Sequence, residues 1–144
     1  MKGLLCLLAL TLPVASSAST FTLDTFLDGS KTTMANQPAL VLYLGGNMNR
    51  NYCTVTATDV YLRSSKGVFT SIKNNQPNFD FECNWGGKYY VLSNKHPTYA
   101  NVTLTPSTST SPMTMYIDAK LTTLKGEPAT FTSGVINLVD NSKQ

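Results

Sequence analysis

The chain of 144 residues has few charged side chains, which make up 13% of the sequence, whereas about 25% is typical of soluble domains. Its net charge of +3 comes from scattered single residues, and no cluster of Lys and Arg follows the pattern of a phosphate-binding surface. The charge therefore gives no support for nucleic acid as a partner. The polar surface must be built from neutral groups, because the chain holds 20 Thr, 13 Ser and 12 Asn. Such a composition favours sheet over helix.

The sequence also lacks the patterns that carry catalysis, nucleotide binding or metal binding. Its one histidine, His96, stands in a polar segment without a Gly-x-Ser-x-Gly or comparable nucleophile motif, so no catalytic triad is expected. The pairs Gly45-Gly46 and Gly86-Gly87 are typical of hairpin turns and not of phosphate-binding loops. Asp80 and Glu82 alternate with apolar residues, which indicates a solvated outer face of a strand. We therefore expect no catalytic residue, no metal and no cofactor, and the chain is predicted not to be an enzyme.

No apolar run reaches the roughly 20 residues that a membrane-spanning helix needs. The longest run, Leu4 to Leu12, follows Lys2 and precedes the small residues Ser16-Ser17-Ala18. This order is typical of a secretory signal peptide, here residues 1–18. Cys6 lies too early in the segment to be a lipidated cysteine. We therefore expect an exported chain in an oxidising compartment.

Two cysteines remain outside the predicted signal peptide, Cys53 and Cys83. They lack the Cys-x-x-Cys spacing of a redox pair, and with one distant histidine they do not form a zinc-binding set. In a small exported chain such a pair most simply forms one disulfide.

Apolar residues recur with period two in short runs that are separated by turn signals, which predicts an all-β domain. The first strand is expected within residues 19–30, with Phe21, Leu23, Thr25 and Leu27 on one face and a turn at residues 28–30. A strand over residues 52–62 needs a bulge near Thr58, because its alternation changes phase there. Further strands are expected at residues 39–44, 68–72, 79–83, 88–92, 101–105, 113–121 and 131–139.

The number and spacing of these strands predict an immunoglobulin-like antiparallel β-sandwich over residues 31–144, with a small barrel as the alternative. A single Trp beside a disulfide is typical of a core position in such domains. Trp85, Tyr89 and Tyr90 could alternatively form an exposed aromatic platform for a ligand. Asn101-Val102-Thr103 matches the N-glycosylation pattern, which matters in a eukaryotic source alone.

Two segments near the ends of the chain share an alternating pattern. One is the N-terminal run Ser19-Thr20-Phe21-Thr22-Leu23-Asp24-Thr25-Phe26-Leu27. The other extends from Pro128 to Asn141, with an aromatic residue, then Thr/Ser and Gly, then alternating aliphatic residues. The first resembles the donor strand, and the second the closing strand, of bacterial chaperone-usher fimbrial subunits.

The resemblance implies an incomplete sandwich whose open groove accepts the N-terminal strand of a neighbouring subunit. The inserted side chains would be Phe21, Leu23, Thr25 and Leu27. The groove would be bordered by Phe131, Val135, Ile136, Leu138 and Val139. Implied partners are identical or related subunits, a periplasmic assembly chaperone, an outer-membrane usher and a host receptor, and the implied location is a fimbrium on the bacterial surface that contributes to adhesion.

The same period-two pattern is expected of a free-standing secreted β-sandwich whose first strand completes its own sheet. Such a domain would bind a carbohydrate or a protein. Alternation alone does not separate these two hypotheses.

Overall fold

The computed structural model describes residues 18–47, 50–71 and 77–139. The predicted signal peptide lies outside the described residues, apart from Ala18. Strands dominate these ranges, and one short helix accompanies them, so the prediction of an all-β chain is confirmed. The elements are β1 (Ser19–Leu23), β2 (Phe26–Met34), β3 (Gln37–Asn47), β4 (Asn51–Thr58), α1 (Asp59–Ser64), β5 (Val68–Ser71), β6 (Phe79–Trp85), β7 (Lys88–Val91), β8 (Tyr99–Thr105), β9 (Thr114–Thr122), β10 (Pro128–Ser133) and β11 (Ile136–Asn137).

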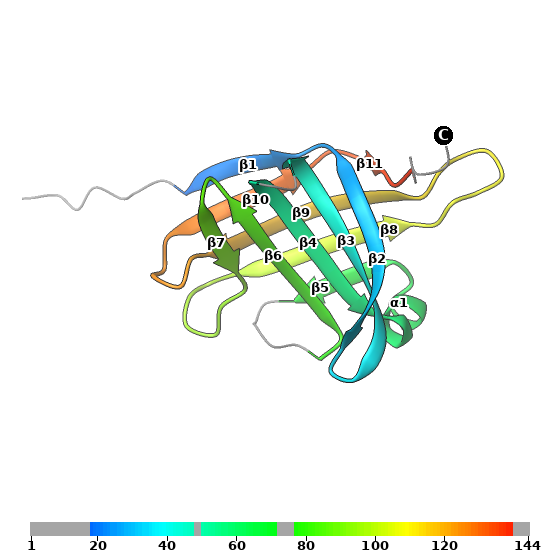
Figure 1. Ribbon diagram of the computed structural model, residues 1–144, viewed down its shortest axis with the longest axis horizontal. Helices are drawn as coiled ribbons and strands as arrows, with labels where there is room; N and C mark the ends of the chain where they lie inside the picture. Colours follow the sequence, from blue (N-terminus) through cyan, green and yellow to red (C-terminus); the bar gives the residue numbers. More distant parts are fainter. Residues whose placement is uncertain (1–17, 48–49, 72–76, 140–144) are drawn as a thin grey trace, which may run out of the picture.

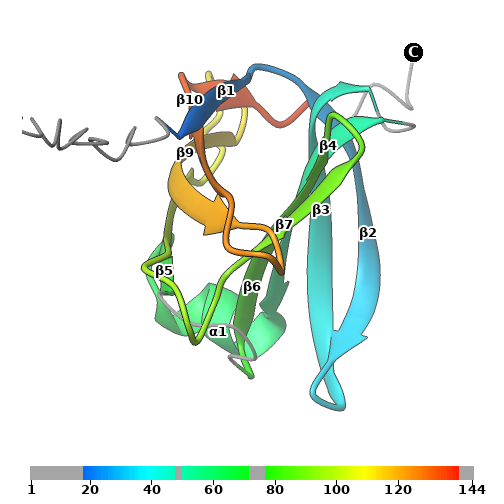
Figure 2. The ribbon, with the colours of Figure 1, turned by 90° about the vertical axis from the view of Figure 1, so that its left-hand side faces the viewer.

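The strands form one curled sheet whose two halves face each other across the core (Figures 1 and 2). The front half in Figure 1 holds β2, β3, β4, β6 and β7, and the other half holds β1, β10, β9, β11, β8 and β5. The halves are joined where Val91 of β7 pairs with Thr122 of β9. Pairing is antiparallel throughout the described strands, except that β1 lies parallel to β10.

The core lies between the two halves and is filled by alternate residues of each strand. In β6, Phe79, Phe81 and Cys83 are buried, as their alternation predicts. In β9 the buried residues are Met115, Ile117, Ala119 and Leu121. Full burial of a large apolar side chain stabilises a fold by about 1.5–3 kcal/mol, so these two strands carry much of the hydrophobic stabilisation.

The predicted disulfide between Cys53 and Cys83 is confirmed. The two residues lie directly opposite each other on neighbouring strands β4 and β6, and both are fully buried. The bridge closes a sequence separation of 30 residues, which by the chain-entropy model stabilises the fold by about 3–4 kcal/mol.

The prediction of one continuous first strand is wrong. The chain leaves the sheet at Asp24 and Thr25 and crosses from β1 in one half to β2 in the other. The Thr25 carbonyl accepts a hydrogen bond from the Gly45 backbone N–H at 2.9 Å, which fixes the crossing. Phe26, which breaks the alternation of the sequence, starts the new strand and packs against the core.

The turn expected at residues 28–30 is also wrong, because β2 continues through them to Met34. The hairpin turns instead at Ala35 and Asn36, whose φ angles are 49° and 61°. Two successive residues with positive φ are typical of the tight turns that match the twist of paired strands.

The bulged strand expected over residues 52–62 is wrong as well. Strand β4 ends at Thr58, which caps helix α1: its hydroxyl accepts a hydrogen bond from the Tyr61 backbone N–H at 3.3 Å. Asp59 stands in the first turn, where a negative charge is favourable. The phase change that indicated a bulge therefore comes from a turn of helix.

The last expected strand, residues 131–139, is divided into β10 and β11 by Gly134 and Val135. Strand β9 pairs with β10 up to Asp118 and with β11 from Met115. Between these two ladders the Ile117 backbone N–H donates to the Ser133 hydroxyl at 2.7 Å. The side chain of Ser133 thus accepts from a backbone N–H at the point where the ladder is interrupted.

Candidate functional site

The three aromatic residues predicted as a ligand platform point to opposite sides of the sheet. Tyr90 is 5% exposed and faces the core, and Trp85 is half-buried, whereas Tyr89 is 41% exposed on the outer face. Successive side chains of a strand alternate between faces, so Tyr89 and Tyr90 cannot share one platform. Of the three, Tyr89 alone is available on the outer face.

Trp85 and Tyr90 belong to an inner aromatic cluster with two further rings, Phe21 of β1 and Phe131 of β10. The Phe21 ring centroid lies 5.5 Å from that of Trp85 and 5.3 Å from that of Phe131. Trp85 and Tyr90 meet Phe131 at 6.0 and 5.4 Å in edge-on arrangements. Such pairs stabilise by about 0.5–1.5 kcal/mol beyond their burial. The cluster therefore ties the N-terminal strand to β6, β7 and β10.

The structure brings together two of the four predicted donor-strand residues. Phe21 is half-buried in the inner aromatic cluster and Leu23 is fully buried. Thr25 is exposed in the crossing segment, and Leu27 lies in β2. In this single chain the groove beside β10 is occupied by the chain's own β1, from Ser19 opposite Ala129 to Leu23 opposite Ser133.

The residues predicted to border the acceptor groove are also divided. Phe131 and Ile136 are buried, and Leu138 is half-buried against the core. Val135 is 73% exposed and Val139 is 46% exposed. Val135 lies in the break between β10 and β11, and Val139 follows β11.

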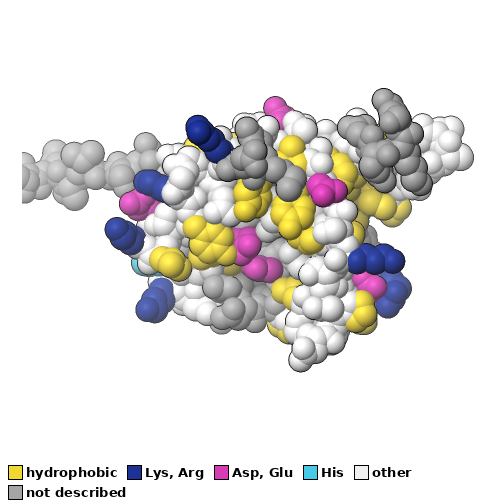
Figure 3. Space-filling model, in the orientation of Figure 1, with side chains coloured by type: hydrophobic (Ala, Val, Ile, Leu, Met, Phe, Trp, Pro, Cys, Tyr) yellow, Lys and Arg dark blue, Asp and Glu magenta, His cyan; other side chains and the backbone are white. Residues whose placement is uncertain are grey.

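The outer face of the front half carries a group of tyrosines around two carboxylates. Figure 3 shows apolar side chains gathered about a pair of acidic ones on this face. We name Tyr43, Tyr52 and Tyr89 the outer tyrosines; the rings of Tyr43 and Tyr52 lie 6.1 Å apart. Asp80 and Glu82 are half-buried between them on β6, which places both carboxylates on the outer face as predicted.

Burial and mutual repulsion alter the acidity of this group. Burial raises the pKa of Asp80 above its ordinary value of 3.8, the charge of Glu82 adds to the rise, and a hydrogen bond from the Phe81 backbone N–H opposes it. The Tyr89 hydroxyl donates to the Glu82 carboxylate. Burial and this hydrogen bond raise the pKa of Tyr89, so that its hydroxyl stays protonated well into the alkaline range.

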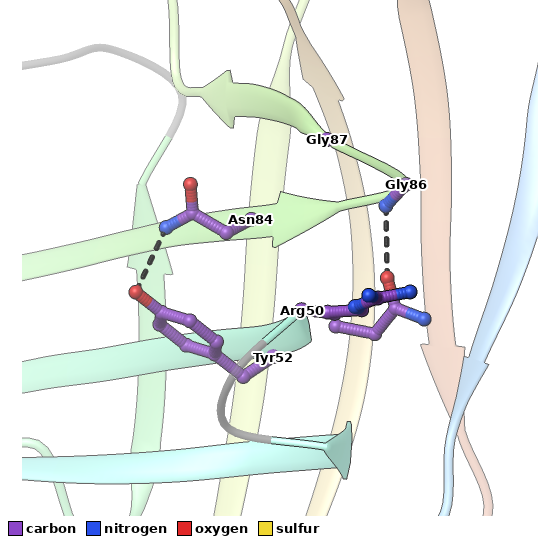
Figure 4. Close-up of a pocket in the computed structure, with 6 residues that line it drawn as sticks. Arg50, Tyr52, Asn84, Gly86 and Gly87 are labelled. Carbon is purple, nitrogen blue, oxygen red and sulfur yellow. Dashed lines mark hydrogen bonds between the residues drawn. The ribbon is translucent and has the colours of Figure 1, made fainter.

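A polar cleft of about 610 Å³ opens at the end of this face, where the start of β4 meets the turn between β6 and β7. It is lined by Arg50, Asn51, Tyr52, Asn84, Gly86 and Gly87. At one side Asn84 donates to the Tyr52 hydroxyl at 3.1 Å, and at the other the Gly86 backbone N–H donates to the Asn51 side-chain oxygen at 2.8 Å (Figure 4). These residues are 32 to 35 positions apart in the sequence, so the cleft depends on the β4–β6 register that the disulfide also holds.

Sequence reasoning missed Arg50, Asn51, Tyr52 and Asn84 as candidate site residues. The cleft arises because Tyr52 is paired directly with Asn84 across two strands. The disulfide prediction could have found this pair, since the residue before Cys53 and the residue after Cys83 must lie opposite each other in antiparallel strands.

A second feature of the surface is the ion pair between Lys88 and Glu127, both exposed. It raises the pKa of the Lys88 amine and lowers the pKa of the Glu127 carboxyl, in both cases through their mutual hydrogen bond first and their charges second. Exposed pairs of this kind add little stability. The pair joins the start of β7 to the turn before β10.

Other classes of site are not found in the part of the chain that the structure describes. No group of three or more His, Cys, Asp and Glu side chains is placed there to hold a metal ion. None of the described helices has the length and apolar character needed to cross a membrane. Asn101 of the glycosylation pattern is exposed on β8.

Comparisons of the chain with protein-family models, with curated proteins and with solved structures find no match.

Proposed function

We propose that this chain is an exported structural subunit that joins copies of itself, or related subunits, by exchange of strand β1. The observation that carries the proposal is the way in which β1 is held. Its Phe21 and Leu23 side chains enter the core beside β10, yet Asp24 and Thr25 alone connect β1 to the rest of the chain. A strand with strong contacts and a short crossing segment is well suited to exchange.

The contacts of β1 can be formed equally well between two chains. Its five residues pair in register with Ala129 to Ser133 of β10. Phe21 joins the inner aromatic cluster through its ring contact with Phe131 of the same strand β10. If Asp24 and Thr25 extend, β1 of one copy can occupy the same groove of the next copy. Repetition of this head-to-tail contact gives a fibre, because each copy both donates and accepts a strand.

The proposal includes the finer features of the family that the sequence resembles. The curled sheet would be an immunoglobulin-like sandwich with β1 as its exchangeable strand. A periplasmic chaperone would cover the edge of β10 before assembly, an outer-membrane usher would receive the subunit, and the product would be an extracellular fimbrium. The buried disulfide supports export, since such bridges form in oxidising compartments.

The test uses a pair of cysteines that reports whether β1 is held by its own chain or by a neighbour. Thr20 and Thr130 lie opposite each other on the outward side of β1 and β10. In Thr20→Cys/Thr130→Cys, oxidation after assembly is expected to give a ladder of covalent multimers on a non-reducing denaturing gel. Oxidised monomers as the sole product would show that β1 stays in its own chain and would reject the proposal.

The matched control is Thr20→Cys/Thr103→Cys, because Thr103 is exposed on β8, where its partners are Val68 and Tyr116 and not β1. It carries the same number of cysteines and is expected to give no ladder. Equal ladders from the two variants would mean random cross-linking of surface cysteines and would count against strand exchange.

A free-standing secreted binding domain is the second candidate function. It is favoured by one observation, the polar cleft on an outer face that β1 does not help to form. In this candidate β1 completes its own sheet permanently. The cysteine test separates the two, because the second candidate gives oxidised monomers alone.

A further inference from the structure

The cleft between the start of β4 and the β6–β7 turn offers hydrogen-bonding groups that the described residues leave unused. Asn84 donates its amide to Tyr52, so the Asn84 carbonyl oxygen and the Tyr52 hydroxyl proton remain available. Asn51 accepts from Gly86 with its oxygen and keeps its amide protons. The cleft therefore presents both donors and acceptors. Their side chains are held by the hydrogen bonds of Asn84 to Tyr52 and of the Gly86 backbone to Asn51.

Arg50 adds a cation to this polar cleft. Its side chain is exposed and lies beside the Gly86 turn (Figure 4). Between described residues the one ion pair is Lys88–Glu127, so none of the described carboxylates neutralises Arg50. The guanidinium group is a planar fork of donors that matches a carboxylate with two parallel hydrogen bonds.

Gly86 and Gly87 carry no side chains that would narrow the cleft. Gly86 and Gly87 have φ angles of 58° and 76°, and the space where their side chains would stand is empty. At about 610 Å³ the cleft has the size of a small-molecule site, for which about 300–1,000 Å³ is usual.

We propose that this cleft binds an acidic saccharide, with Arg50 on the carboxylate and with Asn51, Tyr52 and Asn84 on the ring hydroxyls. A sugar requires donors and acceptors at close spacing, and the two amides and the phenol supply them. The described lining residues offer little to an apolar side chain of a peptide, because Tyr52 provides the one aromatic ring among them. The ring of Tyr52 can in turn pack against the CH groups of a sugar.

The inference goes beyond strand exchange and does not rest on it. None of the described lining residues belongs to β1 or β10, so we expect the same cleft in a monomer and in a fibre. It gives the second candidate function a ligand class, and it holds equally if the chain is a fimbrial subunit. Loss of binding and loss of assembly can therefore be measured separately.

The test is calorimetric titration of the whole exported chain with digalacturonate, and with the neutral disaccharide galactobiose as the matched ligand. We expect digalacturonate to bind at least tenfold more tightly than galactobiose, because a charge-assisted contact to Arg50 is present in the first alone. Equal affinities, or no measurable binding of digalacturonate, would overturn the proposal.

Two variants test whether Arg50 contributes to the binding of digalacturonate. Arg50→Gln is expected to lower the affinity for digalacturonate at least tenfold and to leave galactobiose unchanged. Arg63→Gln, which removes an exposed arginine from α1 at the other end of the front half, is the matched control and should bind as the unaltered chain does. Equal losses in both variants would assign the effect to net charge and overturn the site.

A third titration uses a tripeptide with a free C-terminal carboxylate. Tighter binding of this peptide than of digalacturonate would assign the cleft to peptide ends and reject a saccharide. The cysteine ladder is recorded on Arg50→Gln in the Thr20→Cys/Thr130→Cys background. An unchanged ladder beside lost binding is the expected result, and it shows that the cleft acts independently of assembly.

Discussion

The inner aromatic cluster and the outer tyrosines consist of similar residues on the two faces of one sheet. They differ in the contacts that hold their side chains in place. Inside, Trp85 and Tyr90 pack ring against ring with residues of β1 and β10. Outside, Tyr52 and Tyr89 are held by polar bonds to Asn84 and Glu82. The inner group stabilises the fold, whereas the outer group leaves donors and acceptors at the surface.

Adjacent tyrosines make this difference clearest. Tyr89 and Tyr90 follow each other in β7, yet one is 41% exposed and the other 5% exposed. Strand alternation alone decides which becomes core and which becomes surface. Aromatic content in a segment therefore says little about ligand binding until the face of each residue is known.

The largest effect expected from this comparison is the contrast between Tyr90→Ala and Tyr89→Ala. Removing the buried ring of Tyr90 should lower the free energy of unfolding by about 3–5 kcal/mol, because it leaves a cavity against Phe131. Removing Tyr89 should cost about 1 kcal/mol or less. Urea unfolding followed by fluorescence measures both losses. Similar losses would show that the buried and the exposed tyrosine contribute equally to the free energy of unfolding.

Loss of the disulfide comes next in size. Cys53→Ala/Cys83→Ala should lower the free energy of unfolding by about 2–4 kcal/mol, since the unfolded chain gains the freedom that the bridge removes. The cleft should also lose order, because Tyr52 and Asn84 flank the bridged pair. A variant with unchanged stability would show that packing of β4 on β6 holds this region without the bridge.

Phe21→Ala tests how much the inner cluster depends on β1. Phe21 is half-buried, so a loss of about 2 kcal/mol is expected, less than for a fully buried ring. Thr22→Ala, an exposed change in the same strand, should stay within about 0.5 kcal/mol. Equal and small losses in both would indicate that β1 contributes little to the stability of its own chain.

The sequence predicted the parts of the fold that depend on uninterrupted alternation. The buried residues of β6 and β9 follow their period-two pattern, and the disulfide was predicted from the number of cysteines and the expectation of export. Two of the errors fall where the chain changes direction without a Gly or Pro. At Asp24 and Thr25 it crosses between the two halves of the sheet, and at Thr58 a capping hydroxyl starts a helix.

The candidate site was less predictable than the fold. Nothing in the sequence distinguishes Arg50, Asn51 and Asn84 from other polar residues. The register of β4 and β6 brings them together around one cleft. The sequence favours a core position for Trp85, with an aromatic ligand platform as the alternative, and in the structure its half-buried ring packs against that of Phe21. A pairing of β4 with β6, once assumed from the disulfide, would have placed Tyr52 beside Asn84 and indicated the cleft.

The smallest expected effect concerns Asp80, which lies on the outer face but is half-buried. Its pKa is raised in the folded chain by burial and by Glu82, so the folded state favours the protonated carboxyl more than the unfolded state does. The stability of the unaltered chain should therefore fall as the pH rises from about 3.8 through the folded pKa, and the ionised group then destabilises the fold at neutral pH.

Asp80→Asn removes this charge and keeps an oxygen that can accept from the Phe81 backbone N–H. We expect it to raise the free energy of unfolding at pH 7 by about 0.2–1 kcal/mol, the usual size of a like-charge effect on one sheet face, and to give no gain at pH 3. Unfolding curves at the two pH values measure the difference. Asp24→Asn removes an exposed carboxylate from the crossing segment, so an equal gain there would assign the effect to net charge and not to the burial of Asp80. A gain confined to Asp80→Asn would show that the outer face, unlike the inner cluster, gives up stability to keep a charged and polar surface.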